Sequence, residues 1–451
     1  MRTLATLLVF AAFGCGAASH DSPSARGALG IEAGAITPAG APIVAILDGS
    51  PAEAAGLREG DLLVEIGGRR ITWHCELDTL LFDRDTAAVR IVATRDGKTL
   101  DPTLTPVDRM PLYGDACDAG NAIACFRLAT FESDPRRARE LYAGACKRGA
   151  ADACAQYGYL LMSDGSRDAI EVLEQACDRR SGAACAHLGY LYATGKIVAK
   201  DDLRSLEFYT RGCSAGDARG CYNQGLMRDQ GRGLAMSSTS AAPAYEQACN
   251  DGVSAACTNV GFLYERGRGV MKDVVRAAGF YRRGCDGSPC DGADIRGCVN
   301  LGDAYRDGLG VEQNPALAAE IFRKACAAAP DPQNVDREEA RVHACVLLGA
   351  LEISGLGVTE NVESGLSRSM EGCDRGDSYG CFNVAALRAY REDYAGAATF
   401  YQKACDGGDA EGCYELGVLY DEAKGVPFDD ELRTALFARA CKGGFEKACT
   451  R

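Results

Sequence analysis

The amino-acid sequence predicts an all-α solenoid of disulfide-stapled helical hairpins that follows a small α/β domain. Three observations lead to this prediction. The length of 451 residues exceeds what one hydrophobic core usually serves, which indicates several domains or a repeat array. From Cys117 onward, cysteines recur with a fixed spacing. Before residue 108, short β-type segments separated by Gly, Asp and Pro turns take the place of that pattern.

Composition narrows the function classes. Lys and Arg number 49 against 63 Asp and Glu, which gives a formal charge of -14 and disfavours nucleic acid and anionic lipid as partners. The chain holds 23 cysteines, a number that is unusual in the reducing cytosol, where disulfides rarely persist. We therefore expect an exported protein.

The N-terminus supports export. Met1 and Arg2 precede an apolar stretch, Leu4 to Gly14, that is too short for a permanent membrane anchor, so residues 1–18 read as a signal peptide. The segment "AFGC" resembles a bacterial lipoprotein box, which implies lipidation of Cys15; ordinary cleavage near residues 16–19 is the alternative. Residues 19–26 form a polar tether. Any contact with a membrane would run through this lipid.

Residues 27–107 read as a separate folded unit. Apolar runs at 42–47, 61–68 and 88–98 predict strands, and residues 75–82 predict one helix. "RDGKTL", residues 95–100, reads as a hairpin turn and lacks the glycine that a phosphate-binding loop needs.

Within this unit, "GSPAEAAGLREGDLLVEIGGRRI" (residues 49–71) resembles the centre of a bacterial HtrA-type PDZ domain, and "RGALGI" (26–31) resembles its carboxylate-binding loop. The resemblance implies that a peptide adds a strand to the sheet edge while loop amides hold its terminal carboxylate. Ala28 stands where the family has a glycine or an aromatic residue. The residues implied in peptide binding are Leu29, Gly30 and Ile31 for the carboxylate and Ile31, Leu77 and Leu80 for the last apolar side chain. The alternative is a rigid spacer with an unused groove.

Beyond residue 114, the cysteines form ten pairs. Eight pairs are separated by eight residues, and two carry insertions of five and eleven residues. In six cases the next pair begins 28 residues later, so the period is 28 plus eight, or 36 residues. Such a period is typical of a stacked helical-hairpin solenoid. The pairs are Cys117–Cys125, Cys146–Cys154, Cys177–Cys185, Cys213–Cys221, Cys249–Cys257, Cys285–Cys298, Cys326–Cys345, Cys373–Cys381, Cys405–Cys413 and Cys441–Cys449.

One unit, residues 257–285, illustrates the pattern. "RGRG" ends a first helix, and Asp273 is a suitable N-cap for a second. Ala277, Tyr281 and Cys285 follow at steps of four along one stripe of that second helix. Three shorter units lack the Gly-x-Gly connection and lose loop rather than helix.

This pattern resembles SEL-one-like repeats (SLR), relatives of the tetratricopeptide repeat, and the cysteine spacing resembles the cysteine-rich Hcp branch. The resemblance covers residues 115–451 and implies about nine helical hairpins. Some Hcp relatives have been linked to penicillin binding and weak β-lactamase activity, which is therefore an implied alternative function. The chain has no Ser-x-x-Lys, Ser-Asp-Asn or Lys-Thr-Gly motif, so a serine lactamase is not supported.

The paired cysteines suggest disulfides that join adjacent helices. Each first cysteine ends a helix and each second cysteine begins the next, so the two face each other across a turn at a separation that suits a disulfide. Zinc and thioredoxin-like redox chemistry are the alternatives, and both are disfavoured because no Cys-x-x-Cys occurs. Cys75 and Cys290 are left over, as a buried thiol and a passenger in an insertion; an intermolecular bridge through Cys290 is the sharper alternative.

No catalytic centre is expected. "GCSAG" (212–216) matches Gly-x-Ser-x-Gly, but it lies in a predicted turn between helices and not at a strand-to-helix elbow. The four histidines are scattered and form no metal-binding motif, so no metal or cofactor is expected. We expect an exported scaffold, periplasmic or anchored at the outer membrane, with protein or peptide partners in the cell envelope and unknown oligomeric state. A passive spacer is the structural alternative.

Overall fold

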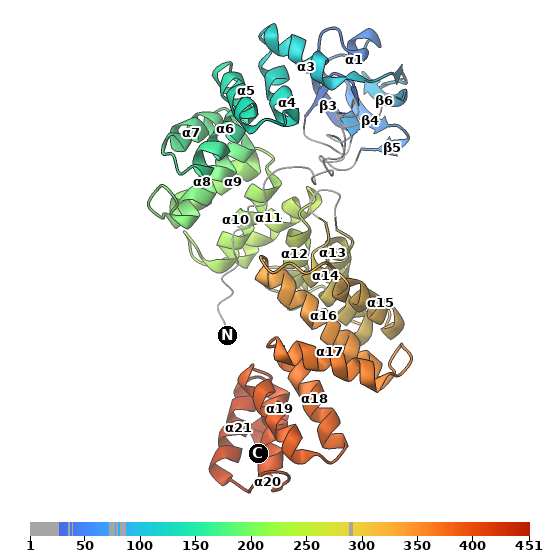
Figure 1. The fold of residues 1–451 in the computed structure, drawn as a ribbon, viewed down its shortest axis with the longest axis vertical. Helices are drawn as coiled ribbons and strands as arrows, with labels where there is room; N and C mark the ends of the chain where they lie inside the picture. The colour runs from blue at the N-terminus through green and yellow to red at the C-terminus, as the bar shows by residue number, and fades with distance from the viewer. Residues whose placement is uncertain are drawn as a thin grey trace. The chain divides into compact units, whose positions relative to one another are not determined.

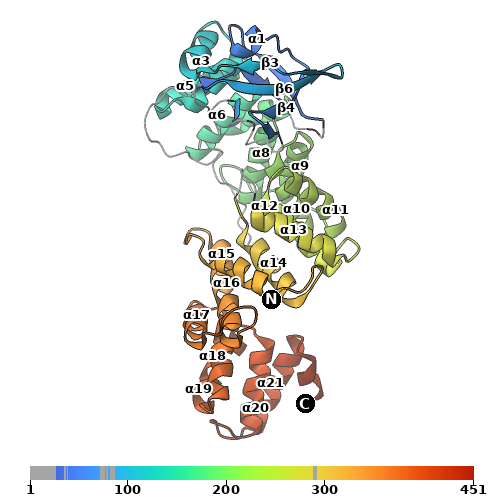
Figure 2. The same ribbon diagram turned by 90° about the vertical axis from the view of Figure 1, so that its right-hand side faces the viewer.

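The structure, a computed structural model, describes residues 27–34, 37, 39–71, 77, 80–81, 87–287 and 292–451. The predicted signal peptide, tether and Cys15, together with Cys75 and Cys290, lie outside the described residues. The chain divides into two compact units. The first comprises Met1–Lys272 and Gly287–Gly292, and the second comprises Asp273–Asp286 and Ala293–Arg451. Figures 1 and 2 show the ribbon in two views.

The first unit begins with an antiparallel β region. Its main sheet has the strand order β2-β3-β4-β6-β7, with β5 paired to β4 and β8 to β6, while β1 pairs with β9. The elements are β1 (Gly27–Ala28), β2 (Ile31–Ala33), β3 (Ala41–Ile46), α1 (Pro51–Ala54), β4 (Leu62–Ile66), β5 (Arg69–Arg70), β6 (Val89–Arg95), β7 (Lys98–Leu100), β8 (Thr103–Leu104) and β9 (Val107–Asp108).

The β elements follow local signals in the sequence. Val89, Ile91 and Ala93 alternate with more exposed residues along β6, so one face of the strand enters the core. Asp96 and Gly97 both have positive φ, 50° and 75°, and they form the two-residue turn between β6 and β7. The predicted hairpin turn in this segment is confirmed.

The α-helical region consists of consecutive helices, most of them of nearly the same length. In the first unit it comprises α3 (Arg109–Asp118), α4 (Ala122–Phe131), α5 (Pro135–Lys147), α6 (Ala151–Ser163), α7 (Asp168–Asp178), α8 (Gly182–Thr194), α9 (Asp202–Ser214), α10 (Ala218–Gln230), α11 (Ser238–Asn250) and α12 (Ser254–Arg266). In the second it comprises α13 (Val274–Asp286), α14 (Ile295–Asp307), α15 (Pro315–Cys326), α16 (Val335–Ser354), α17 (Val362–Asp374), α18 (Ser378–Tyr390), α19 (Tyr394–Asp406), α20 (Ala410–Asp421), α21 (Asp430–Lys442) and the 3-10 helix η1 (Glu446–Thr450).

Successive helices pack as antiparallel hairpins, and a glycine in the first helix receives a ring from the second. Tyr209 of α9 packs on Gly189 of α8, and Phe322 of α15 packs on Gly302 of α14. The pairs Gly225–Tyr245 and Gly417–Phe437 repeat the arrangement. The four rings are buried. The glycine is therefore a packing requirement, because a Cβ at its position would occupy the space of the ring.

Where a Gly-x-Gly loop follows the first helix of a hairpin, its second glycine contacts the hairpin before it. Gly233, in the loop after α10, lies against the first turn of α9, where an added Cβ would overlap the carbonyl of Asp202. Gly357, after α16, lies in the same way against the start of α15. Gly269 and Gly310 make equivalent contacts, as does Gly425, which lies in an Ala-x-Gly loop after α20. Since each of these glycines also has a positive φ, both the backbone conformation and the space favour glycine.

The β region and the first hairpins share one hydrophobic core. Helix α3 follows β9 directly, and Tyr113 and Cys117 of α3 and Leu128 of α4 belong to the same buried cluster as Ile31 and Ile43 of the sheet. The two parts are thus continuous and not separate modules joined by a flexible linker. This sharing could not be read from the sequence pattern, which changes abruptly at residue 108.

The fold class is confirmed: a helical solenoid with paired-cysteine disulfide staples follows a small β region. Among the described residues, ten disulfides connect the ends of consecutive helices, with Cα–Cα distances from 4.3 Å in Cys213–Cys221 to 4.8 Å in Cys441–Cys449. The others are Cys117–Cys125, Cys146–Cys154, Cys177–Cys185, Cys249–Cys257, Cys285–Cys298, Cys326–Cys345, Cys373–Cys381 and Cys405–Cys413. "GCSAG" lies in the turn between α9 and α10, beside one of these bonds.

Candidate protein-binding surfaces

The loop before β2 has a conformation that only glycine adopts easily. Gly30 has φ +73°, and a Cβ there would lie 2.6 Å from the Oγ of Ser50. The carbonyls of Leu29 and Gly30 accept hydrogen bonds from the backbone amides of Ala52 and Leu47, at 3.1 and 2.9 Å. The loop is therefore held to the sheet and to α1 through its carbonyl side.

Strand β2 is the terminal strand in the order of its sheet, so among the described strands it pairs on one side only, with β3. Because the amide of Leu47 bonds to the carbonyl of Gly30, these two residues form a hydrogen-bonded antiparallel pair, and the next pair, Ile31 with Ile46, is a non-hydrogen-bonded one. The amide and carbonyl of Ile31 therefore point away from β3. After a register shift, Ala33 lies opposite Ile43. Because the amide of Gly34 donates to the carbonyl of Pro42, the amide and carbonyl of Ala33 also point away from β3.

The three predicted pocket side chains share one cluster but differ in exposure. Ile31 is 0% exposed and Leu77 is 2% exposed, and both belong to the core cluster. Leu80 is partly buried against the same cluster. The structure thus places Ile31, Leu77 and Leu80 in or against the same hydrophobic core cluster, and their role in peptide binding stays a prediction.

An ion pair links this edge strand to the first solenoid hairpin. The Nε and Nη2 atoms of Arg127, on α4, donate to the carboxylate of Glu32, on β2, at 2.9 and 2.7 Å. Their side chains are only 18% and 11% exposed. Because a bidentate arginine–carboxylate pair fixes both distance and orientation, α4 is anchored against β2. Sequence reasoning missed this contact, since its partners are 95 residues apart.

A second surface is formed by the largest insertion in the repeats. The extra residues between Cys326 and Cys345 lengthen α16 to 20 residues, with Asn334 as its N-cap. We call residues 327–340 the insertion segment. Arg337, within it, donates to the carbonyl of Ala293, which belongs to the other inserted turn. Insertions in a solenoid tend to fall on one face and often mark a binding face.

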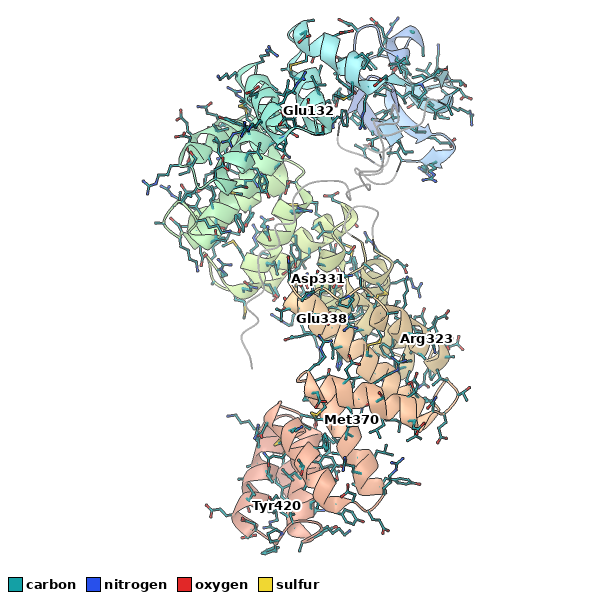
Figure 3. The ribbon with its side chains drawn as sticks, viewed as in Figure 1. Glu132, Arg323, Asp331, Glu338, Met370 and Tyr420 are labelled. Atoms are coloured by element: carbon teal, nitrogen blue, oxygen red, sulfur yellow. A yellow bond between two sulfur atoms is a disulfide. The ribbon has the colours of Figure 1, made fainter. Side chains whose placement is uncertain are left out.

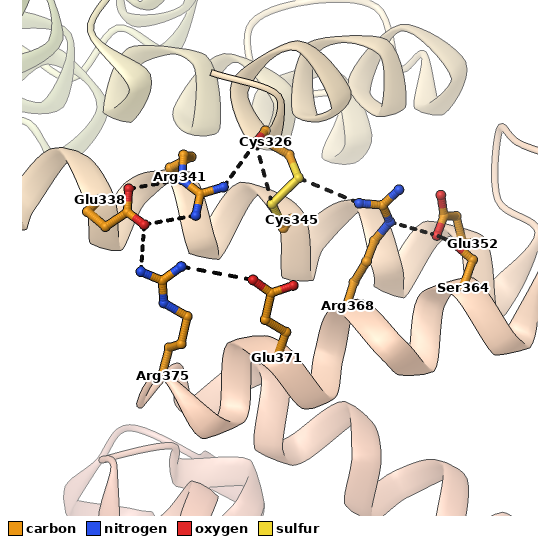
Figure 4. The surroundings of a disulfide bond; sticks show 9 residues. All are labelled: Cys326, Glu338, Arg341, Cys345, Glu352, Ser364, Arg368, Glu371 and Arg375. Carbon is orange, nitrogen blue, oxygen red and sulfur yellow. Dashed lines mark hydrogen bonds and ion pairs between the residues drawn. A yellow bond between two sulfur atoms is a disulfide. The ribbon is translucent and has the colours of Figure 1, made fainter. Parts of the chain in front are cut away.

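An ion-pair network surrounds the Cys326–Cys345 disulfide, which closes the insertion segment (Figure 4). Glu338 accepts from Arg341 at 2.8 Å and from Arg375 at 2.6 Å, and these hydrogen bonds lower the pKa of Glu338 to about 2. Arg368 of α17 pairs with Glu352 at 3.1 Å. Figure 3 places Glu338 on α16 among the other side chains. The network ties α16 to α17 beside the Cys326–Cys345 disulfide.

His343, also on α16, has a carboxylate partner. Its Nδ1 lies 2.7 Å from Oδ2 of Asp377, the N-cap of α18. Burial alone would lower the pKa of His343, but the hydrogen bond and charge of Asp377 raise it above 6.5. Asp303 also raises this pKa, and Arg306 lowers it. The pair connects adjacent hairpins of the second unit.

The His343–Asp377 pair predicts a pH dependence of stability. A pKa above the unfolded value of 6.5 stabilises the folded state below that pH, and the contribution is lost as the pH rises through the folded-state pKa. We expect about 0.2–1 kcal/mol from such a partly exposed pair. Hydrogen exchange of α16 and α18 at pH 6 and pH 9 would measure it. His343→Gln should flatten this difference, and an unchanged pH response in the variant would contradict the assignment.

Within the described ranges, no group of three or more His, Cys, Asp and Glu side chains could hold a metal ion. Burial lowers the pKa of His187 to about 4, so it stays neutral near pH 7. In the same part of the chain, no helix has the length and apolar character to cross a membrane.

Two known protein families match segments of this chain. The Sel1 repeat family matches residues 122–149, 182–217, 254–288, 295–329, 379–409 and 410–445. Six stretches of the chain are thus Sel1 repeats. The PDZ domain family matches residues 43–79, which begins after the loop at Leu29 to Ile31. Both predicted resemblances are confirmed.

Solved structures similar to this chain include bacterial repeat proteins. A protective antigen of uropathogenic Escherichia coli with an SLR fold is 21% identical, with a TM-score of 0.48, covering 75% of this chain and 80% of that one. A Sel1 repeat protein from Oxalobacter formigenes is 18% identical (TM-score 0.48, 72% and 92% covered). Helicobacter pylori cysteine rich protein B is 29% identical (TM-score 0.24, 27% and 91% covered). Among curated proteins, none matches the sequence.

Sel1-repeat proteins generally mediate protein–protein interactions, and scaffolds of this kind are typically not enzymes. Ten disulfides are typical of proteins that fold outside the reducing cytosol.

Proposed function

We propose that this protein is an exported scaffold that captures the C-terminus of an extended peptide at β2 and binds a second protein surface with its solenoid. The backbone groups of Ile31 and Ala33, which point away from β3 on the terminal strand of the sheet and next to the Gly30 loop, are the observation that carries the proposal. A peptide strand added there would gain hydrogen bonds at no cost to the existing ladder.

The proposal assigns the carboxylate of the peptide to the amides of Leu29, Gly30 and Ile31. The carbonyls of Leu29 and Gly30 are already bonded inward, so the peptide units of this loop are fixed in orientation. A fixed array of amides binds an anion without reorganisation. The apolar side chains of Leu77 and Leu80 favour an apolar last residue.

Binding of labelled peptides to the full oxidised chain, followed by fluorescence anisotropy, tests this assignment. Peptides that end in a free carboxylate and an apolar residue should bind, and replacing that carboxylate by a carboxamide should weaken binding by about tenfold or more, since hydrogen bonds to charged groups are worth roughly 1.5–3 kcal/mol. Equal affinity for both forms would refute the carboxylate assignment.

Ala33→Pro provides the matched variant. Proline removes the outward amide of Ala33, which is not part of the ladder with β3, and proline is tolerated on edge strands. We expect weaker peptide binding with little change in thermal unfolding. If no peptide binds but an envelope protein is retained by the solenoid, the scaffold function survives without the peptide site; if neither binds, the passive spacer is favoured.

We also propose that Cys15 is lipidated and anchors the protein at the membrane. The lipoprotein-like segment before Cys15 and the tether after it support this. Metabolic labelling with a palmitate analogue should mark the wild type and leave Cys15→Ala unlabelled. Labelling of both or of neither would remove the anchor from the proposal.

A further inference from the structure

We infer that Cys326–Cys345 is a thiol-exchange site, at which an external thiol attacks Cys345 and Arg368 stabilises the departing Cys326 thiolate. This inference does not rest on peptide binding at β2. It concerns one of the ten disulfides and is argued from its exposure, its charged neighbours and the segment that it closes.

Exposure sets this bond apart from the other interior staples. Cys326 and Cys345 are both half-buried, whereas every other disulfide except the C-terminal one buries at least one of its two cysteines. Cys285–Cys298, the other widened turn, is buried on both sides, at 4% and 3% exposed. An attacking thiol must reach a sulfur atom, so access limits exchange at the buried bonds.

Positive charge lies beside one sulfur atom only. Nη1 of Arg368 lies 3.6 Å from Sγ of Cys326, while Arg341 donates to the backbone carbonyl of the same residue at 3.2 Å (Figure 4). A neighbouring arginine stabilises the thiolate over the thiol. Since a more stable thiolate leaves faster, Cys326 is the better leaving group of the two.

Two other bonds each have one of these properties. Arg148 contacts Sγ of Cys125 at 2.7 Å, but Cys117 and Cys125 are 5% and 1% exposed. Cys449 is exposed, and within the described residues its sulfur has a contact to the carbonyl of Phe445 and none to an arginine. Among the ten disulfides of the described residues, Cys326–Cys345 combines partial exposure of both cysteines with an arginine beside one sulfur atom.

The exchange balances in two steps. A thiolate attacks Sγ of Cys345, a sulfur–sulfur bond forms, and the Cys326–Cys345 bond breaks with its electron pair passing to Sγ of Cys326. A second thiolate then attacks the external sulfur and releases Cys345 as a thiolate, which takes a proton from solvent. Overall, two external thiols are oxidised to one disulfide and the protein disulfide is reduced to two thiols.

The bond closes the insertion segment. Its cysteines are 19 residues apart, the largest separation among the ten bonds. Once it opens, residues 327–340 remain joined to the solenoid through polar contacts such as Glu338 with Arg375 and Arg337 with the carbonyl of Ala293. Exchange with a thiol would therefore loosen a surface that the disulfide otherwise fixes.

Incubating the full oxidised chain with reduced glutathione and then trapping free thiols by alkylation tests the inference by peptide mass spectrometry. Cys326–Cys345 should open at least about tenfold faster than Cys117–Cys125 and Cys285–Cys298, because both of these are buried. The first adduct should place glutathione on Cys345 and a free thiol on Cys326. Equal rates, or glutathione mainly on Cys326, would overturn the inference.

Arg368→Gln separates a charge effect from a structural one. Loss of the positive charge should slow opening of this bond about threefold to tenfold, through a poorer leaving thiolate, and leave Cys441–Cys449 unchanged. Simple loosening of the helices would instead speed the opening. Arg368→Lys should retain most of the wild-type rate. Faster or unchanged opening in Arg368→Gln would exclude the proposed role of Arg368.

Discussion

Replacing both Cys213 and Cys221 by alanine is expected to lower the local free energy of unfolding by about 2.6 kcal/mol, the loop-closure value for nine residues. Both cysteines are buried, and the bond joins the end of α9 to the start of α10 in the interior of the first unit. Because a solenoid unfolds by repeats and not as one body, native-state hydrogen exchange of these two helices is the suitable measurement.

The C-terminal staple is the matched control. Cys441–Cys449 has the same separation of eight residues, but it holds only the 3-10 helix η1 against α21, and Cys449 is exposed. Its double alanine variant should lose protection in η1 and little elsewhere. If both variants cost the same small amount, the interior staples do not stabilise the repeats as the chain-entropy account requires.

Gly302→Ala is expected to destabilise the second unit by about 1–3 kcal/mol, the usual cost of overpacking a core. A Cβ at Gly302 would lie 2.7 Å from Cδ1 and Cζ of Phe322, whose side chain is 0% exposed. The ring cannot move into solvent without leaving the core. Thermal unfolding and hydrogen exchange of α14 and α15 would measure the loss.

Replacing Gly279 by alanine should increase stability, whereas the same substitution at Gly302 decreases it. Gly279 lies on the exposed face of α13, and a Cβ there meets nothing within 4 Å. Alanine has the higher helix propensity, so Gly279→Ala should stabilise this helix by about 0.8–1 kcal/mol. Combining Gly302→Ala with Phe322→Leu should recover part of the loss. Equal effects at both glycines would show that helix propensity, and not the ring, governs Gly302.

The repeat architecture could be predicted because its determinants are local. Cysteine spacing, Gly-x-Gly loops and caps such as Asp273, whose carboxylate accepts from the amides of Val275 and Arg276, recur with the period of the fold. The lengthened α16 was missed. Asn334 followed by the helix-forming residues 337–340 was a usable signal for it, but no structure was predicted for the eleven inserted residues.

The binding surfaces were less predictable, because they depend on contacts between distant residues. The predicted residues Leu29 to Ile31 lie at and just before the terminal strand β2, and their role in peptide binding stays a prediction. The Arg127–Glu32 pair and the arginines around Cys326 join residues from different helices, and no local pattern marks them. The shared core of the sheet and α3–α4 was missed for the same reason.

That shared core bears on how the array ends. A stack of repeats leaves the face of its first member open to water, and solenoid proteins require a terminal cap to cover it. Here Tyr113 and Leu128 are buried in one cluster with Ile31 and Ile43, so the β region takes the place of a capping repeat. Cutting the chain at residue 108 would therefore expose apolar surface on both fragments, so the β region and the first repeats depend on each other for stability.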